Sequence, residues 1–231
     1  MSKKLIAACM AIAAFAALAV ASTASAAPVL THPTGTVMSV HPTGKTCTED
    51  PTGCIKGTNT GETTMVSALG TVRCTNATMT GTLDTNSTAS GSKGTVTSAS
   101  FSGTGTNGEC TSWTGGVTVT PGVAGGLPWC LEATGSTDEG KIRGGKCSEL
   151  ARSIRYTLDF TTITSGPCNY VRSNPAVVTF VTHPEAAKVS LTNQVWTAEP
   201  GNPIGCPSSG ELNMTFDLYT DNNNEPLYFS S

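Results

Sequence analysis

Charged and aromatic residues are scarce in this chain of 231 residues, at 13% and 6% of the composition. Thirteen lysines and arginines face 16 aspartates and glutamates, so the formal net charge is −3. Nucleic-acid binding needs clustered basic side chains that displace counterions from phosphates. We therefore expect no nucleic-acid partner.

Long hydrophobic runs are also lacking. The longest extends over the 16 residues from Leu5 to Val20, whereas a membrane-spanning helix needs about 20. Lys3 and Lys4 precede this run, and Ala24 to Ala26 supply the small residues of a signal-peptidase site. The pattern predicts a signal peptide over 1–26, secretion to the extracellular space or cell surface, and no membrane span.

Nine cysteines are present, and cleavage after Ala26 would remove Cys9 and leave an even set of eight. Such a set in an exported chain predicts disulfides. The closest pair has six residues between its members, which does not fit the CxxC spacing of zinc sites. Eight cysteines can form four disulfides in 105 ways, and their spacing alone does not select one of them. The simplest hypothesis pairs cysteines that are neighbours in the sequence. The candidates are Cys47 with Cys54, Cys74 with Cys110, Cys130 with Cys147, and Cys168 with Cys206.

Residues 27–62 differ in composition from the rest of the mature chain. They are rich in proline, glycine and threonine, and His-Pro-Thr-Gly occurs twice, starting at His32 and His41. We predict an extended lead-in over 27–62 that contains the short disulfide loop, followed by one domain over 63–231.

Alternating residues predict many short strands after position 63. Apolar residues occupy every second position in 154–160 and again in 212–218, with mostly polar residues between them. This alternation is typical of strands with one buried face. Further strands are expected at 71–83, 95–102, 116–120, 127–134, 176–182, 187–198 and 226–230. The predicted fold is all-β, an antiparallel β-sandwich or barrel-like sandwich stapled by disulfides.

Catalytic motifs are missing or incomplete. Neither GxSxG nor HExxH occurs, and the GxGxxG sequence at Gly103–Gly108 is not followed by a helical pattern. The GxxxxGK sequence at Gly135–Lys141 has Ile142 where a nucleotide-binding loop needs Ser or Thr. We therefore predict a non-enzymatic protein with no cofactor, and rank a hydrolase using scattered carboxylates last.

Metal sites are weak alternatives. His32, His41 and His183 each precede a proline, which is typical of turns and strand ends. The run Asp221–Glu225 resembles a calcium loop, but Pro226 stands where an EF-hand needs glycine. A polar turn is the expected structure there, with calcium binding as the alternative.

Three tryptophans and three asparagines are candidate surface sites. Trp113, Trp129 and Trp196 would stack on sugar rings if exposed, or pack in the core if buried. Glycosylation sequons begin at Asn76, Asn86 and Asn213 and have meaning only in a host that glycosylates.

The order of several segments resembles small exported bacterial proteins of the alkane-oxidation protein activator type. These segments are Cys74–Thr82, Val96–Gly103, Cys110, Gly126–Trp129, Cys168 and Cys206–Pro207, and the similarity covers about two-thirds of the chain. The His-Pro-Thr-Gly lead-in, the four additional cysteines at 47, 54, 130 and 147, and the long C-terminal strands depart from that pattern. The resemblance implies an extracellular accessory or structural role and supplies no catalytic residue.

Together these observations predict a secreted, non-enzymatic protein of the cell surface or extracellular matrix, and the resemblance implies a context of biofilm or hydrophobic substrates. Its expected partners are surface or matrix components, including polysaccharide. The alternative function is a carbohydrate-binding module that uses exposed tryptophan.

Overall fold

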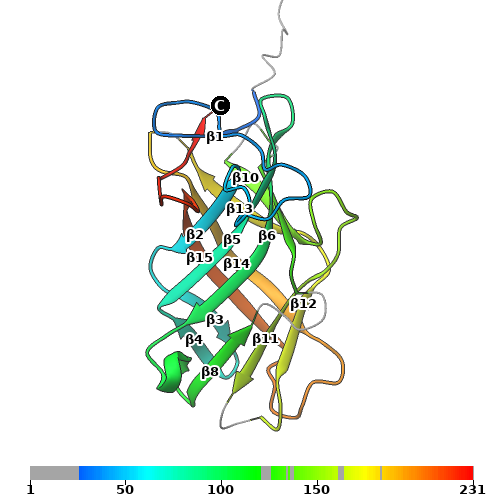
Figure 1. The fold of residues 1–231 in the computed structure, drawn as a ribbon. Helices are drawn as coiled ribbons and strands as arrows, with labels where there is room; N and C mark the ends of the chain where they lie inside the picture. The colour runs from blue at the N-terminus through cyan, green and yellow to red at the C-terminus, as the bar shows by residue number, and fades with distance from the viewer. Residues whose placement is uncertain are drawn as a thin grey trace, which may run out of the picture.

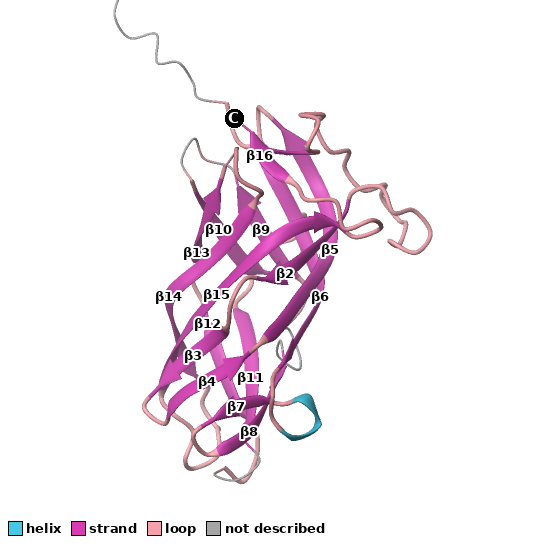
Figure 2. Cartoon of the chain, turned by 90° about the vertical axis from the view of Figure 1, so that its left-hand side faces the viewer, coloured by secondary structure: helices cyan, strands magenta, loops and turns pink. Residues whose placement is uncertain are grey.

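The fold is all-β and antiparallel (Figures 1 and 2). This computed structural model describes residues 26–120, 126–133, 135, 138–160, 164–182 and 184–230. The strands in chain order are β1 (Val29–Thr31), β2 (Cys54–Asn59), β3 (Thr63–Ser67), β4 (Gly70–Cys74), β5 (Asn76–Ser87), β6 (Gly91–Ser102), β7 (Cys110–Ser112), β8 (Gly115–Thr120), β9 (Trp129–Ala133), β10 (Glu139–Gly144), β11 (Ile154–Phe160), β12 (Cys168–Arg172), β13 (Ala176–Val181), β14 (Lys188–Ala198), β15 (Ser209–Thr220) and β16 (Tyr228–Ser230). The predicted all-β class is confirmed, and the large sheet takes the closed form.

The large sheet consists of two closed circuits that share the pair β14–β15. One circuit runs β10-β13-β14-β15-β2-β5-β6-β9 and returns to β10. The other runs β14-β12-β11-β8-β7-β4-β3-β15 and returns to β14. In Figure 1 the first circuit occupies the upper half of the molecule and the second the lower half. We call them the upper and lower circuits.

A β-bulge in β14 lies where this strand passes from one circuit to the other. Leu191 pairs with Met214 and Gln194 with Leu212, so two residues of β14 oppose one residue of β15. Asn193 in this bulge has φ +53°, and its backbone N–H donates to Asn213 Oδ1 at 2.7 Å. Bulges bend a strand and increase its twist. The bend allows one strand to serve both circuits.

The alternation of side chains expected from the sequence determines which residues face the core. In β11, Ile154, Tyr156, Leu158 and Phe160 are all buried, and in β15 Met214, Phe216 and Leu218 are buried while Leu212 is partly exposed. Thr157 departs from the pattern: it is buried on the predicted polar face, where its hydroxyl donates to Asn169 Oδ1 at 2.8 Å.

The small sheet β1–β16 closes the end of the upper circuit. It joins the two ends of the described chain, and Leu30 of β1 pairs with Phe229 of β16. Both side chains are buried. Figure 1 shows these strands at the top of the molecule. We call β1, β16 and the bridge Thr31–Val37 the cap.

The lead-in expected over 27–62 belongs partly to the sheets. β2 lies inside this range, yet it is a central strand of the upper circuit between β15 and β5. Its sequence, Cys-Ile-Lys-Gly-Thr-Asn, lacks the alternation of the later strands, so its place in the sheet follows from backbone pairing with β15 and β5 rather than from a local pattern. The segment expected as one strand over 71–83 is likewise divided between β4 and β5.

Four disulfides connect neighbouring segments. They join Cys47 to Cys54, Cys74 to Cys110, Cys130 to Cys147, and Cys168 to Cys206. Sequence neighbours are thus paired throughout, as in the simplest hypothesis. The sheet register explains this outcome for the second bridge, since β4 pairs with β7 and places Cys74 beside Cys110.

Within the described residues, no helix has the length and apolar character needed to cross a membrane.

Candidate functional site

Trp113 forms an exposed aromatic platform at the tip of the β7–β8 hairpin. The side chain is 73% exposed. Its indole N–H donates to the Leu69 carbonyl oxygen in the β3–β4 turn. Gly70 has φ +97°, and a Cβ added there would lie 2.5 Å from the indole ring. The glycine therefore allows the ring to lie against the turn, which fixes the orientation of the platform.

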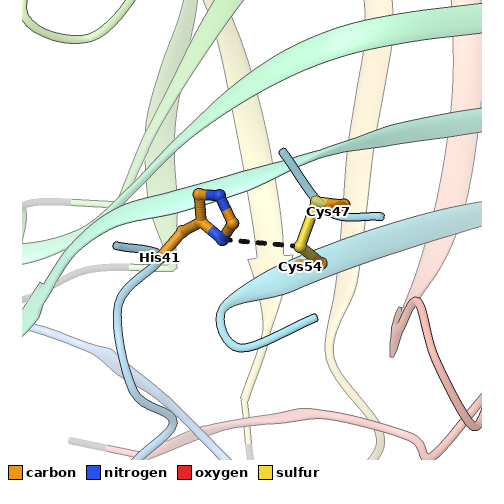
Figure 3. Close-up of side chains that lie close together, drawn as sticks. All are labelled: His41, Cys47 and Cys54. Carbon is orange, nitrogen blue, oxygen red and sulfur yellow. Dashed lines mark hydrogen bonds between the residues drawn. A yellow bond between two sulfur atoms is a disulfide. The ribbon is translucent and has the colours of Figure 1, made fainter. Parts of the chain in front are cut away.

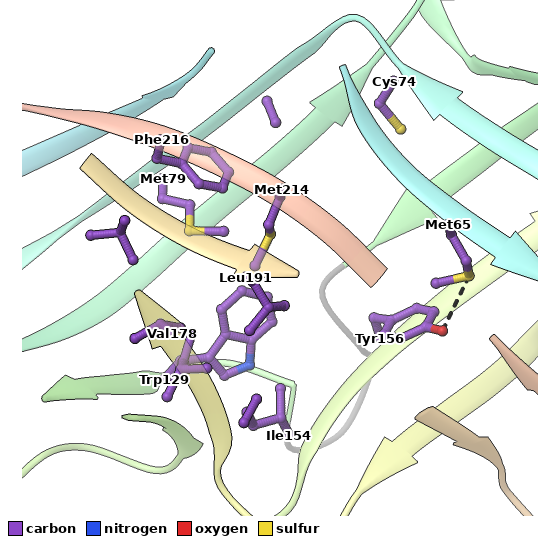
Figure 4. Close-up of a cluster of buried hydrophobic side chains, with 14 of the residues drawn as sticks. Met65, Cys74, Met79, Trp129, Ile154, Tyr156, Val178, Leu191, Met214 and Phe216 are labelled. Carbon is purple, nitrogen blue, oxygen red and sulfur yellow. Dashed lines mark hydrogen bonds between the residues drawn. The ribbon is translucent and has the colours of Figure 1, made fainter. Parts of the chain in front are cut away.

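Trp129 and Trp196 are not available for sugar stacking. They are only 3% and 2% exposed, so the candidate role of sugar binding is wrong for these two residues. Trp196 makes an edge contact with Tyr156 at a centroid distance of 5.1 Å. Figure 4 shows Trp129 among Leu191, Val178 and Ile154. Large aromatic rings stabilise a core through the area they bury, and these two serve that purpose.

The tyrosines next to Trp196 are part of the same core. Tyr156 stacks on Tyr170, and its hydroxyl donates to Met65 Sδ at 3.1 Å (Figure 4). Burial raises the pKa of Tyr170 to about 12 and that of Tyr156 well above its usual range. Both hydroxyls remain protonated at neutral pH, which makes them poor candidates for acid–base chemistry.

A hydroxyl-rich face covers the outside of β2, β5 and β6. Cross-strand register places Thr58 beside Thr78, Thr78 beside Ser100, and Thr80 beside Ser98. The hydroxyls of Thr78 and Ser100 are 2.8 Å apart and hydrogen-bonded. Lys56, opposite Thr80, adds one positive charge. The face therefore offers hydroxyl donors and acceptors to hydrated polymers.

His41 contacts two backbone carbonyl groups in and beside the loop that the Cys47–Cys54 disulfide closes (Figure 3). Its Nδ1 lies 2.6 Å from the Thr52 carbonyl oxygen and its Nε2 lies 3.0 Å from the Lys45 carbonyl oxygen. Carbonyl oxygens only accept, so both contacts are hydrogen bonds only when the ring is doubly protonated. The contact with Lys45, followed by that with Thr52 and the charges of Asp50 and Asp84, raises the pKa of His41.

This arrangement predicts a pH-dependent loop. Because the folded-state pKa is raised, stabilisation by His41 is complete below the ordinary histidine pKa of about 6.5 and is lost as pH rises through the folded value. Backbone amides of the loop between His41 and Cys54 should therefore exchange faster at about pH 8 than at about pH 5.5 after correction for intrinsic rates. His41→Gln, which does not titrate, should remove this difference. A His41 pKa at or below the ordinary value in an NMR titration would contradict the interpretation.

The grouping of His41, Cys47 and Cys54 resembles a metal site only in its distances. Their ligand atoms lie within 4.8 Å of one another, and His41 Nδ1 is 3.5 Å from Cys54 Sγ. Both sulfurs are bonded to each other. Metals require the thiolate form of cysteine, so the oxidised loop offers no cysteine ligands.

Two of the remaining polar candidates, His32 and the acidic turn Asp221–Glu225, lie together in the fold. His32 Nδ1 is 3.1 Å from Glu225 Oε2. In the acidic turn that contains Glu225, Thr220 bonds to Asn223, and the Glu225 backbone N–H donates to the Thr220 hydroxyl. The predicted polar turn is therefore formed, with these groups used inside it. His183 lies outside the described residues.

Asn86 holds the cap to the upper circuit, and the sequence offered only its sequon as a signal. Its Oδ1 accepts from Leu30 N–H at 2.9 Å, while its Nδ2 donates to the carbonyl oxygens of Leu30 and Met38, both at 2.8 Å. Ser92 Oγ lies 2.7 Å from Asn86 Oδ1 and 3.1 Å from the Pro28 carbonyl oxygen, and these two acceptors share its single hydroxyl hydrogen. A glycan on Nδ2 would break this network, so the Asn86 sequon is incompatible with modification of the folded chain.

Comparison with known proteins returned no matching family model, no matching curated protein and no matching solved structure.

Proposed function

We propose that this protein is an exported, non-enzymatic accessory protein that acts by binding at the cell surface or in the extracellular matrix. The main support is the set of four disulfides in an all-β fold. Disulfides persist in oxidising compartments outside the cytosol. The hydroxyl-rich face on β2, β5 and β6 is compatible with hydrated matrix polymers as partners.

The proposal is tested in cells. Fractionation should recover the protein outside the cytosol with residues 1–26 removed and all eight remaining cysteines oxidised. A deletion strain should lose adhesion, aggregation or growth on hydrophobic carbon, and re-expression should restore the lost property. Recovery of a cytosolic protein with free thiols would overturn the proposal, as would a deletion strain unchanged in all three properties.

Carbohydrate binding through Trp113 is the second candidate function. It is favoured by one observation: the indole is exposed and is held in place by Leu69 and Gly70. Stacking on a fixed aromatic ring loses less side-chain freedom than stacking on a mobile one. A polysaccharide of the host matrix is the expected ligand class.

Tryptophan fluorescence discriminates this candidate from the first. Titration with a binding polysaccharide should change the emission of Trp113, and Trp113→Ala should abolish both the change and retention on the polysaccharide. Val66→Ala, at an exposed apolar position on β3, is a matched surface control that should bind normally. Equal retention of Trp113→Ala and the unaltered protein would refute a role for this platform.

A further inference from the structure

The upper circuit encloses a cavity of about 80 Å³, whereas the cavity in the lower circuit measures about 30 Å³. The upper cavity lies among inward-facing apolar side chains from the circuit, including Ile55, Leu131 and Phe216. Ile142, Leu191 and Met214 line both cavities and separate them. An antiparallel circuit of eight strands has an interior that side chains fill or that holds one small ligand.

Small residues at inward positions account for the larger space. Gly57 of β2 and Ala133 of β9 both line the upper cavity and contribute almost no side chain to it. A Cβ at Gly57 would meet Phe216 at 3.4 Å, an ordinary contact, so the backbone there does not require glycine for close packing. The space therefore depends on the choice of residue, and larger side chains at these positions would reduce it.

The lining selects an apolar occupant. No charged side chain is among the described residues that line the cavity. Its hydroxyl-bearing lining residues are Thr80, Thr82, Ser92 and Thr95. Thr82 and Thr95 donate to the Asp84 carboxylate, and the single hydroxyl hydrogen of Ser92 has Asn86 Oδ1 and the Pro28 carbonyl oxygen as acceptors. A single water needs only about 10–15 Å³ but also two to four polar partners. The cavity has room for several waters without those partners, which favours a small hydrocarbon over water.

The cap forms the removable part of the wall. Leu30 of β1 and Phe229 of β16 belong to the cap and also line the cavity. The circuit itself is closed by continuous strand pairing, while β1 and β16 pair only with each other among the named strands. Side-chain bonds from Asn86 and Ser92 attach β1 to the circuit. Displacing the cap thus exposes the cavity without breaking the circuit.

The geometry points to a binding site for one small apolar molecule, of a few carbon atoms, inside the upper circuit and under the β1–β16 cap. The matrix or surface role proposed above does not depend on it. Benzene and xenon serve as probes, because both bind dry apolar cavities in proteins.

Binding is tested by thermal unfolding with and without benzene and by xenon NMR. Benzene should raise the Tm of the unaltered protein, since a ligand that binds only the folded state stabilises it. Ala133→Leu should lose most of this shift, and Gly57→Ala, which fills less space, should reduce it by a smaller factor. Val119→Leu, in the wall of the lower cavity, is the matched control and should respond like the unaltered protein.

Two results would overturn the proposal. One is an unaltered protein whose Tm and xenon spectrum do not respond to the probes. The other is a folded Ala133→Leu or Gly57→Ala variant that responds as fully as the unaltered protein. Either failure leaves the extracellular role and its fractionation test unaffected.

The entry route under the cap is tested by the rate of xenon exchange. Asn86→Ala should increase the rate at which xenon exchanges between the cavity and solvent, whereas Asn76→Ala on the same strand should not. Equal exchange rates in these two variants would place the route elsewhere.

Discussion

Replacing Cys168 and Cys206 together by alanine should lower the free energy of unfolding by about 4 kcal/mol, because the bridge closes a long loop of the unfolded chain. The two cysteines are 38 positions apart and join β12 to the loop between β14 and β15. Chemical denaturation at fixed pH, followed by circular dichroism, measures the loss.

The matched control is the double substitution of Cys47 and Cys54. These residues are only seven positions apart, so the same chain-entropy relation gives a loss of about 2 kcal/mol. The loop they close lies outside the two circuits except for Cys54, the first residue of β2. If both double variants lost the same stability, restriction of the unfolded chain would not be the main effect of the bridges.

Replacing Asn86 by alanine should cost about 2–3 kcal/mol, since several backbone groups of the cap lose a partner and an unpaired buried polar group costs about 1–3 kcal/mol. Leu30 N–H retains Ser92 Oγ, and the Leu30 carbonyl retains Met38 N–H, which keeps the loss moderate. Hydrogen exchange should show the effect first at the amide of Leu30 in the cap and at the amide of Met38, which follows the Thr31–Val37 bridge.

Two further variants sharpen this prediction. Asn86→Asp preserves shape but removes both amide donors, so its carboxylate faces the Leu30 and Met38 carbonyls and destabilisation should be at least as large. Asn76→Ala removes an exposed asparagine of the same strand, whose Nδ2 donates to Thr75 Oγ1 at 3.3 Å, and should have little effect. An intact cap in Asn86→Ala would show that packing of Leu30 and Phe229 is sufficient to hold it.

The local alternation of apolar and polar residues predicted the clearest strands and which of their faces are buried. The alternation in β11 and β15 depends on successive side chains pointing to opposite faces, a property of the backbone that needs no tertiary information. Thr157 shows the limit of that rule: its polar side chain is buried because Asn169 on the adjacent strand bonds to its hydroxyl.

The candidate site was less accessible to sequence reasoning. Turn-forming residues flank both Trp113, which precedes Gly115 and Gly116, and Trp129, which follows Pro128, so this signal does not separate the exposed ring from the buried one. Exposure follows from position in the fold, with Trp113 in a hairpin turn and Trp129 in the wall of the lower cavity. Local sequence marks Asn86 only as a sequon, because its backbone partners are 48 and 56 positions away along the chain.

The amino-acid sequence by itself determined the all-β class, the inward and outward faces of the clearest strands and the supply of paired cysteines, because each follows from local composition and spacing. Only the tertiary structure decided that two circuits share β14 and β15, that β2 belongs to the sheet, that a cap closes an apolar cavity, and that one tryptophan is exposed. These features depend on which distant strands pair and in what register, and that choice is made by burial and hydrogen bonding across the whole chain.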